Sequence, residues 1–165
     1  MVSQLQHLTL FSPTPDIVVY FEVPQKLPET VSQLQHLTLS KVLAAKLTSI
    51  PDGIGRLSRL CELDLSDCNA LQKLQSSLTQ LRFLCVLRLN NTSIVSLPPR
   101  FALLTRLRTL NLFGCDRLKA LPGDLTELKV LQELNVRWCK QAIDGMSRAL
   151  RCGLRDMHGL TFVRS

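Results

Sequence analysis

Aromatic residues are scarce in this chain of 165 residues: they make up 5% of it, with one tryptophan and one tyrosine. Hydrophobic residues nevertheless reach 45%, which excludes disorder by composition. A core with so few rings has to be built from aliphatic side chains. The composition therefore predicts one domain in which the same aliphatic positions are buried many times.

The sequence also lacks long apolar runs. No stretch approaches the roughly 20 apolar residues of a membrane-spanning helix. The N-terminal segment has no basic start, and its only apolar run, Ile17 to Phe21, is too short for a secretory signal. We therefore expect no membrane span, and a soluble protein located in the cytoplasm.

Catalytic and cofactor motifs are missing as well. There is no HExxH, GxSxG or GxxxxGK[ST] motif, and no CxxC pair. His7, His36 and His158 are scattered, and neither His7 nor His36 has a nearby serine or cysteine that would suggest a nucleophile. We predict that the chain is not an enzyme and that it uses no cofactor and no metal.

The six cysteines follow a regular spacing instead of a disulfide or zinc pattern. They are Cys61, Cys68, Cys85, Cys115, Cys139 and Cys152. Periodic structure explains these gaps, so we predict buried, reduced thiols in a reducing compartment. Those at the turn after a strand (Cys68, Cys115 and Cys139), and Thr92 at the same position of its unit, are expected to hydrogen-bond the turn backbone along the stack.

What the sequence does have is a repeat. The pattern Leu60-x-x-Leu63-x-Leu65-x-x-Cys68 occurs again, with conservative changes, from Leu84, from Leu107 and from Leu131, so the interval between copies is nearly constant. A fixed period of this size is typical of a solenoid, in which each unit is stable only when stacked on its neighbours.

Each unit combines two periodicities. The units open at Leu27, Ile50, Leu74, Leu97 and Leu121, and apolar residues follow at steps of 4, 3 and 3, as on one face of a helical or 3-10 segment. The spacing then changes to two, which is the period of a strand. The sequence thus predicts an α/β solenoid, a leucine-rich stack of about six repeats of about 23–24 residues with a parallel, concave sheet.

Three segments are expected: an irregular N-terminal repeat or loop over 1–26, the repeats over 27–140, and a C-terminal helix and final strand over 141–165. In the unit that opens at Leu27, Ser40 and Val42 fall at the two inward strand positions. We expect Asp144 to cap a helix that starts near Gly145, and a last strand near 159–163. The sequence VSQLQHLTL occurs twice, at 2–10 and at 31–39, and its role stays open.

The stretch NLFGCDRLKALPGDLTEL, from Asn111 to Leu128, resembles a leucine-rich repeat. The form LxLxxCxxLxxLPxxLxxL is similar to the repeats of plant nucleotide-binding disease-resistance proteins and of intracellular leucine-rich repeat proteins of the Ras group. The resemblance implies a horseshoe fold and a partner-binding or autoinhibitory module in immune or GTPase-linked signalling. The nucleotide-binding domain that defines the resistance family is not encoded in this sequence.

Residues between the strand leucines should face away from the core, onto the concave side. Their mixed charge, together with Phe113 and nearby Trp138, suits a protein partner. We predict a non-catalytic protein-protein interaction module whose site is formed by the following residues: Lys41, Glu62, Asp64, Ser66, Arg88, Asn90, Thr109, Asn111, Phe113, Glu133, Asn135 and Arg137.

The formal net charge of +7 leaves a second hypothesis open. The basic residues are dispersed, with no run of five or more, but the following fall on the return segments, which should face the convex side: Arg56, Arg59, Arg82, Arg100, Arg106, Arg108, Lys119 and Lys129. This flank could bind nucleic acid or an anionic surface, although nucleic acid is disfavoured on the concave face because its charges balance. A third hypothesis is a non-functional fragment of a larger receptor.

Overall fold

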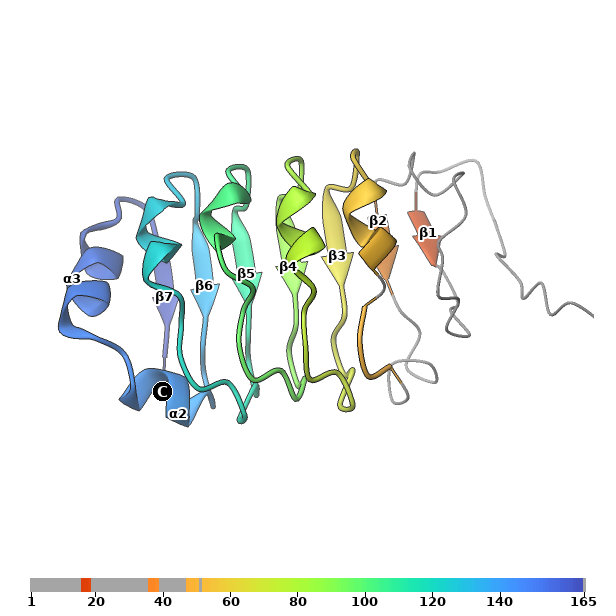
Figure 1. The fold of residues 1–165 in the computed structure, drawn as a ribbon. Helices are drawn as coiled ribbons and strands as arrows, with labels where there is room; N and C mark the ends of the chain where they lie inside the picture. The colour runs from red at the N-terminus through yellow and green to blue at the C-terminus, as the bar shows by residue number, and fades with distance from the viewer. Residues whose placement is uncertain (1–15, 19–35, 39–46, 51, 165) are drawn as a thin grey trace, which may run out of the picture.

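The repeating leucines build a parallel sheet to which each unit contributes one strand. The computed structural model describes residues 16–18, 36–38, 47–50 and 52–164. Figure 1 shows the strands side by side in chain order, with short helices in a second layer. The seven strands are β1 (Asp16–Val18), β2 (His36–Thr38), β3 (Glu62–Asp64), β4 (Val86–Arg88), β5 (Thr109–Asn111), β6 (Glu133–Asn135) and β7 (Thr161–Val163).

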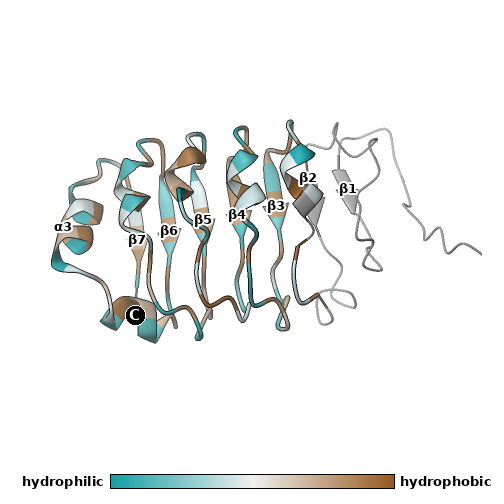
Figure 2. Cartoon of the chain, viewed as in Figure 1, coloured by the Kyte–Doolittle hydropathy of each residue, from teal (hydrophilic) through white to brown (hydrophobic). Residues whose placement is uncertain are grey.

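The central residue of each strand fixes the register of the sheet. These residues are Ile17, Leu37, Leu63, Leu87, Leu110, Leu134 and Phe162. In β3 to β6 the central leucine is fully buried and the residues on either side are half-buried. Figure 2 shows the hydrophilic residues that flank the central leucine in β3 and β6. The predicted inward positions of the strands are thus confirmed for these four units.

One predicted strand position is wrong. In the unit that opens at Leu27, Ser40 and Val42 were expected to point inward, but Leu37 is the residue that pairs with Leu63. The sequence Leu34-x-x-Leu37-x-Leu39 matches Leu60-x-x-Leu63-x-Leu65, so the strand follows this motif and not the spacing counted from Leu27-Pro28. Ser40 and Val42 themselves lie outside the described residues.

The return segments are 3-10 helices: η2 (Asp52–Arg56), η3 (Ser76–Gln80), η4 (Phe101–Leu103) and η5 (Gly123–Glu127). η3, η4 and η5 each end at a leucine whose ψ of 58–77° leaves the helical region and whose N–H donates to the carbonyl three residues earlier. Their buried side chains, such as Leu78, Phe101 and Leu125, pack in the same core as the strand leucines.

The C-terminal part differs from the expected one at its helices. After β6 the chain forms α2 (Lys140–Asp144) and then α3 (Arg148–Asp156), which packs against η5. Asp144 ends α2, so the predicted cap is wrong. Ser147 caps α3 instead, because its Oγ accepts from the N–H of Leu150 at 3.2 Å. The final strand expected near 159–163 is confirmed as β7.

Among the described residues, no helix is long and apolar enough to cross a bilayer. Likewise, that part of the chain holds no group of three or more histidine, cysteine or acidic side chains that could bind a metal ion.

Candidate binding surface

One side of the sheet packs on the leucine core, and the other side carries the half-buried residues of each strand. We call this second side the open sheet face; it is the face predicted to be concave. In β3 to β6 it presents the following side chains: Glu62, Asp64, Val86, Arg88, Thr109, Asn111, Glu133 and Asn135. Ser66, Asn90, Phe113 and Arg137 follow at the next outward position of the same units.

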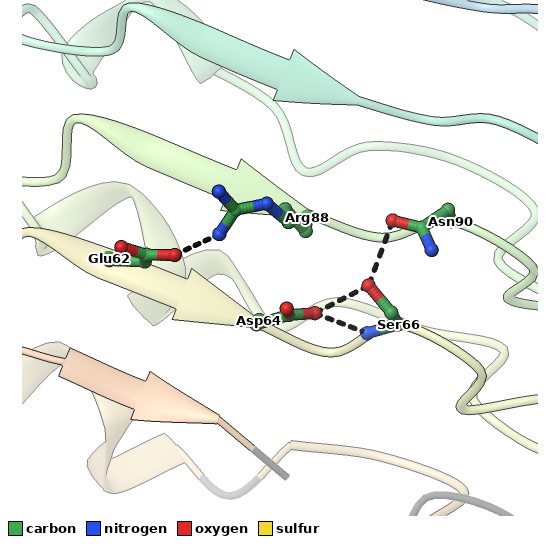
Figure 3. A network of polar contacts seen from close by, with 5 residues as sticks. All are labelled: Glu62, Asp64, Ser66, Arg88 and Asn90. Atoms are coloured by element: carbon green, nitrogen blue, oxygen red, sulfur yellow. Dashed lines mark hydrogen bonds and ion pairs between the residues drawn. The ribbon is translucent and has the colours of Figure 1, made fainter. Parts of the chain in front are cut away.

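An ion pair joins the first two of these units. Arg88 Nη1 on β4 contacts Glu62 Oε1 on β3, and both side chains are only partly exposed (Figure 3). These charges therefore satisfy each other across the sheet before any partner arrives. A partly exposed pair of this kind adds about 0–1 kcal/mol to stability, because solvent screens it.

A second polar network lies beside this pair. Ser66 Oγ hydrogen-bonds Asp64 Oδ1 and also contacts Asn90 Oδ1, 2.8 Å away, and the backbone N–H of Ser66 donates to Asp64 Oδ1 at 2.9 Å. Figure 3 shows the three side chains close together where β3 ends. The network orients the side chains of Asp64 and Asn90, so a partner would meet a fixed polar patch here.

In other units as well, the side chain at the end of the strand accepts a hydrogen bond from the backbone of the following turn. Asn111 Oδ1 accepts from the N–H of Phe113 at 3.0 Å, and Asn135 Oδ1 accepts from the N–H of Arg137 at 3.2 Å. Asp64, Asn111 and Asn135 occupy equivalent positions in the register. Each closes a turn onto the backbone two residues later. These three predicted site residues therefore stabilise the turn that follows their own strand.

The predicted residue Lys41, together with its neighbours on the expected strand, lies outside the described residues. The register of β2 also changes its expected position, because residues 36–38, and not the segment around Ser40, pair with β3.

The turn after each strand contains a position that sequence reasoning did not identify. Asp67, Asn91, Gly114 and Trp138 occupy it in four successive units, and all have positive φ, between 56° and 71°. Asparagine, aspartate and glycine tolerate this left-handed conformation, whereas a bulky residue there is an outlier. Trp138 is also 63% exposed. Its backbone is strained and its ring is exposed, next to Arg137 at the edge of the open sheet face.

Three cysteines and a threonine follow these turns inside the core. Cys115 Sγ donates to the carbonyl of Leu89 at 3.1 Å, and Cys139 Sγ donates to that of Leu112 at 2.9 Å. Each bond reaches into the preceding unit. Thr92 Oγ1 donates to the carbonyl of Leu89 at 2.8 Å. The expected bonding to the turn backbone is therefore observed for Thr92, Cys115 and Cys139.

The thiols differ in burial and in pKa. Cys68 is fully buried, and burial together with Asp64 and Asp67 raises the pKa of its thiol to about 12. Its neighbour Cys115 and burial likewise raise the pKa of Cys139. Cys61 and Cys85 are half-buried, and Cys152 is exposed on α3. The prediction of buried thiols thus holds for three of the cysteines and not for the rest.

Alkylation should separate these classes. At about pH 7.5, iodoacetamide should modify Cys152 first and leave Cys68 and Cys139 intact, because a raised pKa leaves almost no thiolate near neutral pH. Mass spectrometry of digested samples over time would measure this, with Cys152→Ser as the control. Modification of Cys68 in the folded protein as fast as Cys152 would contradict the buried turn.

Comparisons with known proteins identify the fold. No family model matches the chain, and no curated protein sequence matches it. Among solved structures, a leucine-rich repeat protein of Leptospira interrogans superposes with a TM-score of 0.53 at 22% identity, over 84% of this chain and 39% of that chain. The protein thus has the leucine-rich repeat fold, and it spans about two fifths of the length of that structure.

Two further structures have lower scores. The leucine-rich repeat domain of the type III effector XopL gives a TM-score of 0.39 at 21% identity, over 88% of this chain and 72% of that domain. The plant peptide hormone receptor RGFR1 in complex with RGF2 gives 0.45 at 20% identity, over 84% of this chain and 26% of the receptor chain.

Proposed function

We propose that this chain is a non-catalytic binding module that holds a protein partner on the open sheet face. One observation carries the proposal. Trp138 has a mostly exposed ring and a left-handed backbone, whereas the equivalent positions of the three preceding units hold aspartate, asparagine or glycine. Backbone strain is often retained where a side chain has a function. Tryptophan and arginine are also the residues that contribute most to protein interfaces.

The neighbouring side chains support a protein partner. Phe113 is half-buried and Arg137 is exposed, in units next to each other. Toward β3, the Glu62–Arg88 pair and the polar network around Ser66 supply fixed donors and acceptors. A surface with one apolar end and one polar, charge-balanced end fits the mixed chemistry of a protein interface.

A photo-crosslinking experiment tests this face. Benzoylphenylalanine placed at Thr109, on the open sheet face, should give an adduct of defined mass in an extract of the cells that express the protein. The same group at Ala120, exposed in the loop after β5, is the control and should give none.

Two substitutions then test the role of the ring. Trp138→Asn introduces the residue that position 91 uses, so it removes the ring and relieves the backbone strain. We expect a loss of about 2 kcal/mol of binding free energy, roughly 30-fold in affinity, with no loss of stability. Arg137→Glu should also lower the yield of the adduct. Unchanged adduct yield from folded Trp138→Asn protein would refute the proposed site.

We further propose a place in immune or GTPase-linked signalling inside the cytoplasm. The support is the repeat form LxLxxCxxLxxLPxxLxxL and the buried thiols, which suit a reducing compartment. A nucleotide-binding domain encoded in the reading frame next to this sequence would favour the immune class. Co-purification with a Ras-type GTPase would favour the other.

A further inference from the structure

A second surface lies on another side of the molecule, in the four loops that lead from the 3-10 helices into β3, β4, β5 and β6. These loops are residues 58–61, 82–85, 105–108 and 129–132, at the top of Figure 1. They hold five exposed basic residues, namely Arg59, Arg82, Arg106, Arg108 and Lys129, and no acidic residue. We call these loops the basic ridge.

Apolar side chains interrupt the charge on the basic ridge. Phe83 is 45% exposed and Val130 is 44% exposed, and Leu103, at the end of η4, is 45% exposed. Equivalent positions of successive units read Arg59, Phe83, Arg106 and Val130, so charge and apolar character alternate along the solenoid. Three of the four large hydrophobic residues exposed in the described chain therefore lie on or next to this basic strip.

The ridge ends in a hollow. A cavity of about 530 Å³ opens beside β6 and β7, between the last loop of the ridge and the turn before β7. Its lining includes Arg108, Lys129, Val130, Gln132 and His158, and no acidic residue. The hollow has the size of a few side chains and an electropositive wall with apolar side chains between the charges.

We propose that the basic ridge binds an extended peptide segment of a partner protein in which every second residue faces the ridge and these facing residues are alternately acidic and apolar. Neighbouring strands lie about 4.8 Å apart, so Arg59 and Val130 are separated by roughly 15 Å, the length of about five extended residues. Acidic side chains of the segment would pair with the arginines, and its apolar side chains would pack on Phe83 and Val130. One end of the segment would enter the hollow, where Arg108 and Lys129 meet a carboxylate.

Two other anionic partners fit less well. A single-stranded nucleic acid would need open aromatic faces for its bases, but the guanidinium of Arg106 lies over the Phe83 ring, 4.4 Å from its centroid. A lipid bilayer would need protruding apolar side chains, but Phe83, Leu103 and Val130 are each more than half covered by the protein. Half-covered side chains beside arginines, with a hollow at one end, suit the side chains of a peptide.

Fluorescence anisotropy can test this with defined probes. The probe is a labelled octapeptide with glutamate, leucine, glutamate and phenylalanine at its odd positions and serine at its even positions, so that the charged and the apolar side chains lie on one face. The comparison probes are the same octapeptide with serine in place of leucine and phenylalanine, an eight-nucleotide oligothymidine, and phosphatidylcholine vesicles with phosphatidylserine. We expect the first peptide to bind at least about tenfold more tightly than the glutamate-serine peptide, because only the former covers the apolar side chains.

Matched variants assign the binding to the ridge. Arg108→Glu with Lys129→Glu should weaken the first peptide about tenfold. Arg117→Glu with Lys119→Glu makes the same change in net charge in the loop that leaves β5, and should change binding less than about twofold. Phe83→Ser with Val130→Ser removes apolar surface at constant charge and should weaken binding about fivefold. Thermal melts confirm that each variant is folded.

Four results would overturn the proposal: no binding of the first peptide, equal loss in the two charge-reversed variants, tighter ridge-dependent binding of oligothymidine, or tighter ridge-dependent binding of the vesicles. Because none of these substitutions lies on the open sheet face, failure here leaves the crosslinking test at Thr109 unaffected.

Discussion

Replacing Phe101 by alanine should lower the free energy of unfolding by about 3–5 kcal/mol. Phe101 is fully buried in η4, and it is the one aromatic residue among the buried core residues of the described chain. Equivalent positions in the other units hold Ile54, Leu78 and Leu125. The core around Phe101 is therefore shaped for a larger side chain, and alanine would leave a cavity that the stacked units cannot close.

A conservative substitution at the same position is the control. Phe101→Leu introduces the residue that neighbouring units use, so the loss should stay below that of alanine, at roughly 1–2 kcal/mol. Urea unfolding followed by circular dichroism would measure both variants. Equal losses for alanine and leucine would mean that the volume of the ring is not what the site requires.

The second large effect is expected at Gly114. Its φ is +71°, and a Cβ there would lie 2.3 Å from Asn91 Oδ1. Gly114→Ala brings the left-handed penalty of about 1–2 kcal/mol, whereas the exposed side chain of Asn91 can move aside at little cost, so we expect a loss of about 1–2 kcal/mol of stability. The same unfolding experiment would measure this loss.

Two variants separate the causes of that loss. Asn91→Gly with Gly114→Ala is compared with Asn91→Gly alone, because position 91 also has a positive φ. This comparison removes the contact with Asn91 and retains the strain at position 114, so the loss caused by alanine should stay about the same. Gly123→Ala is the matched control, because a Cβ there meets nothing within 4 Å and should be neutral or stabilising by about 0.4–1 kcal/mol. Full stability of the single variant Gly114→Ala would show that the turn can adopt another conformation.

The leucines made most of the fold predictable. Leu63, Leu87, Leu110 and Leu134 take the positions that alternation assigned to them, because a side chain in a strand can face only one of two sides. The unit around Leu37 was placed in the wrong register because the interval from Leu37 to Leu63 is longer than the interval between the later strand leucines. A period extrapolated from neighbouring units cannot show that one unit is longer.

The local ends of elements were harder to predict. Asp144 and Ser147 both have side chains that can cap a helix, and only the folded chain shows that Ser147 reaches the N–H of Leu150. The choice depends on where α2 ends, and a sequence pattern fixes the end of a helix only to within a residue or two.

The candidate site, too, could be predicted only in part. Its outward positions followed from the strand period, but the bonds among them did not. Nothing in the sequence distance between Glu62 and Arg88 indicates an ion pair. Nor could composition reveal that Trp138 occupies a left-handed position. The signal becomes visible only when equivalent positions of the repeat are compared. Asp67, Asn91 and Gly114 suit a left-handed turn, and tryptophan is the exception.

The thiol bonds of the core have a mechanical consequence. Cys115 and Cys139 each anchor a turn to a carbonyl of the unit before it, so neighbouring units are coupled by directional bonds as well as by packing. In a solenoid, such couplings between neighbours determine how far a local opening spreads along the chain. Oxidation of either thiol, once exposed by unfolding, would remove its S–H donor. The protein would then refold into the complete stack only if both thiols had stayed reduced while it was unfolded.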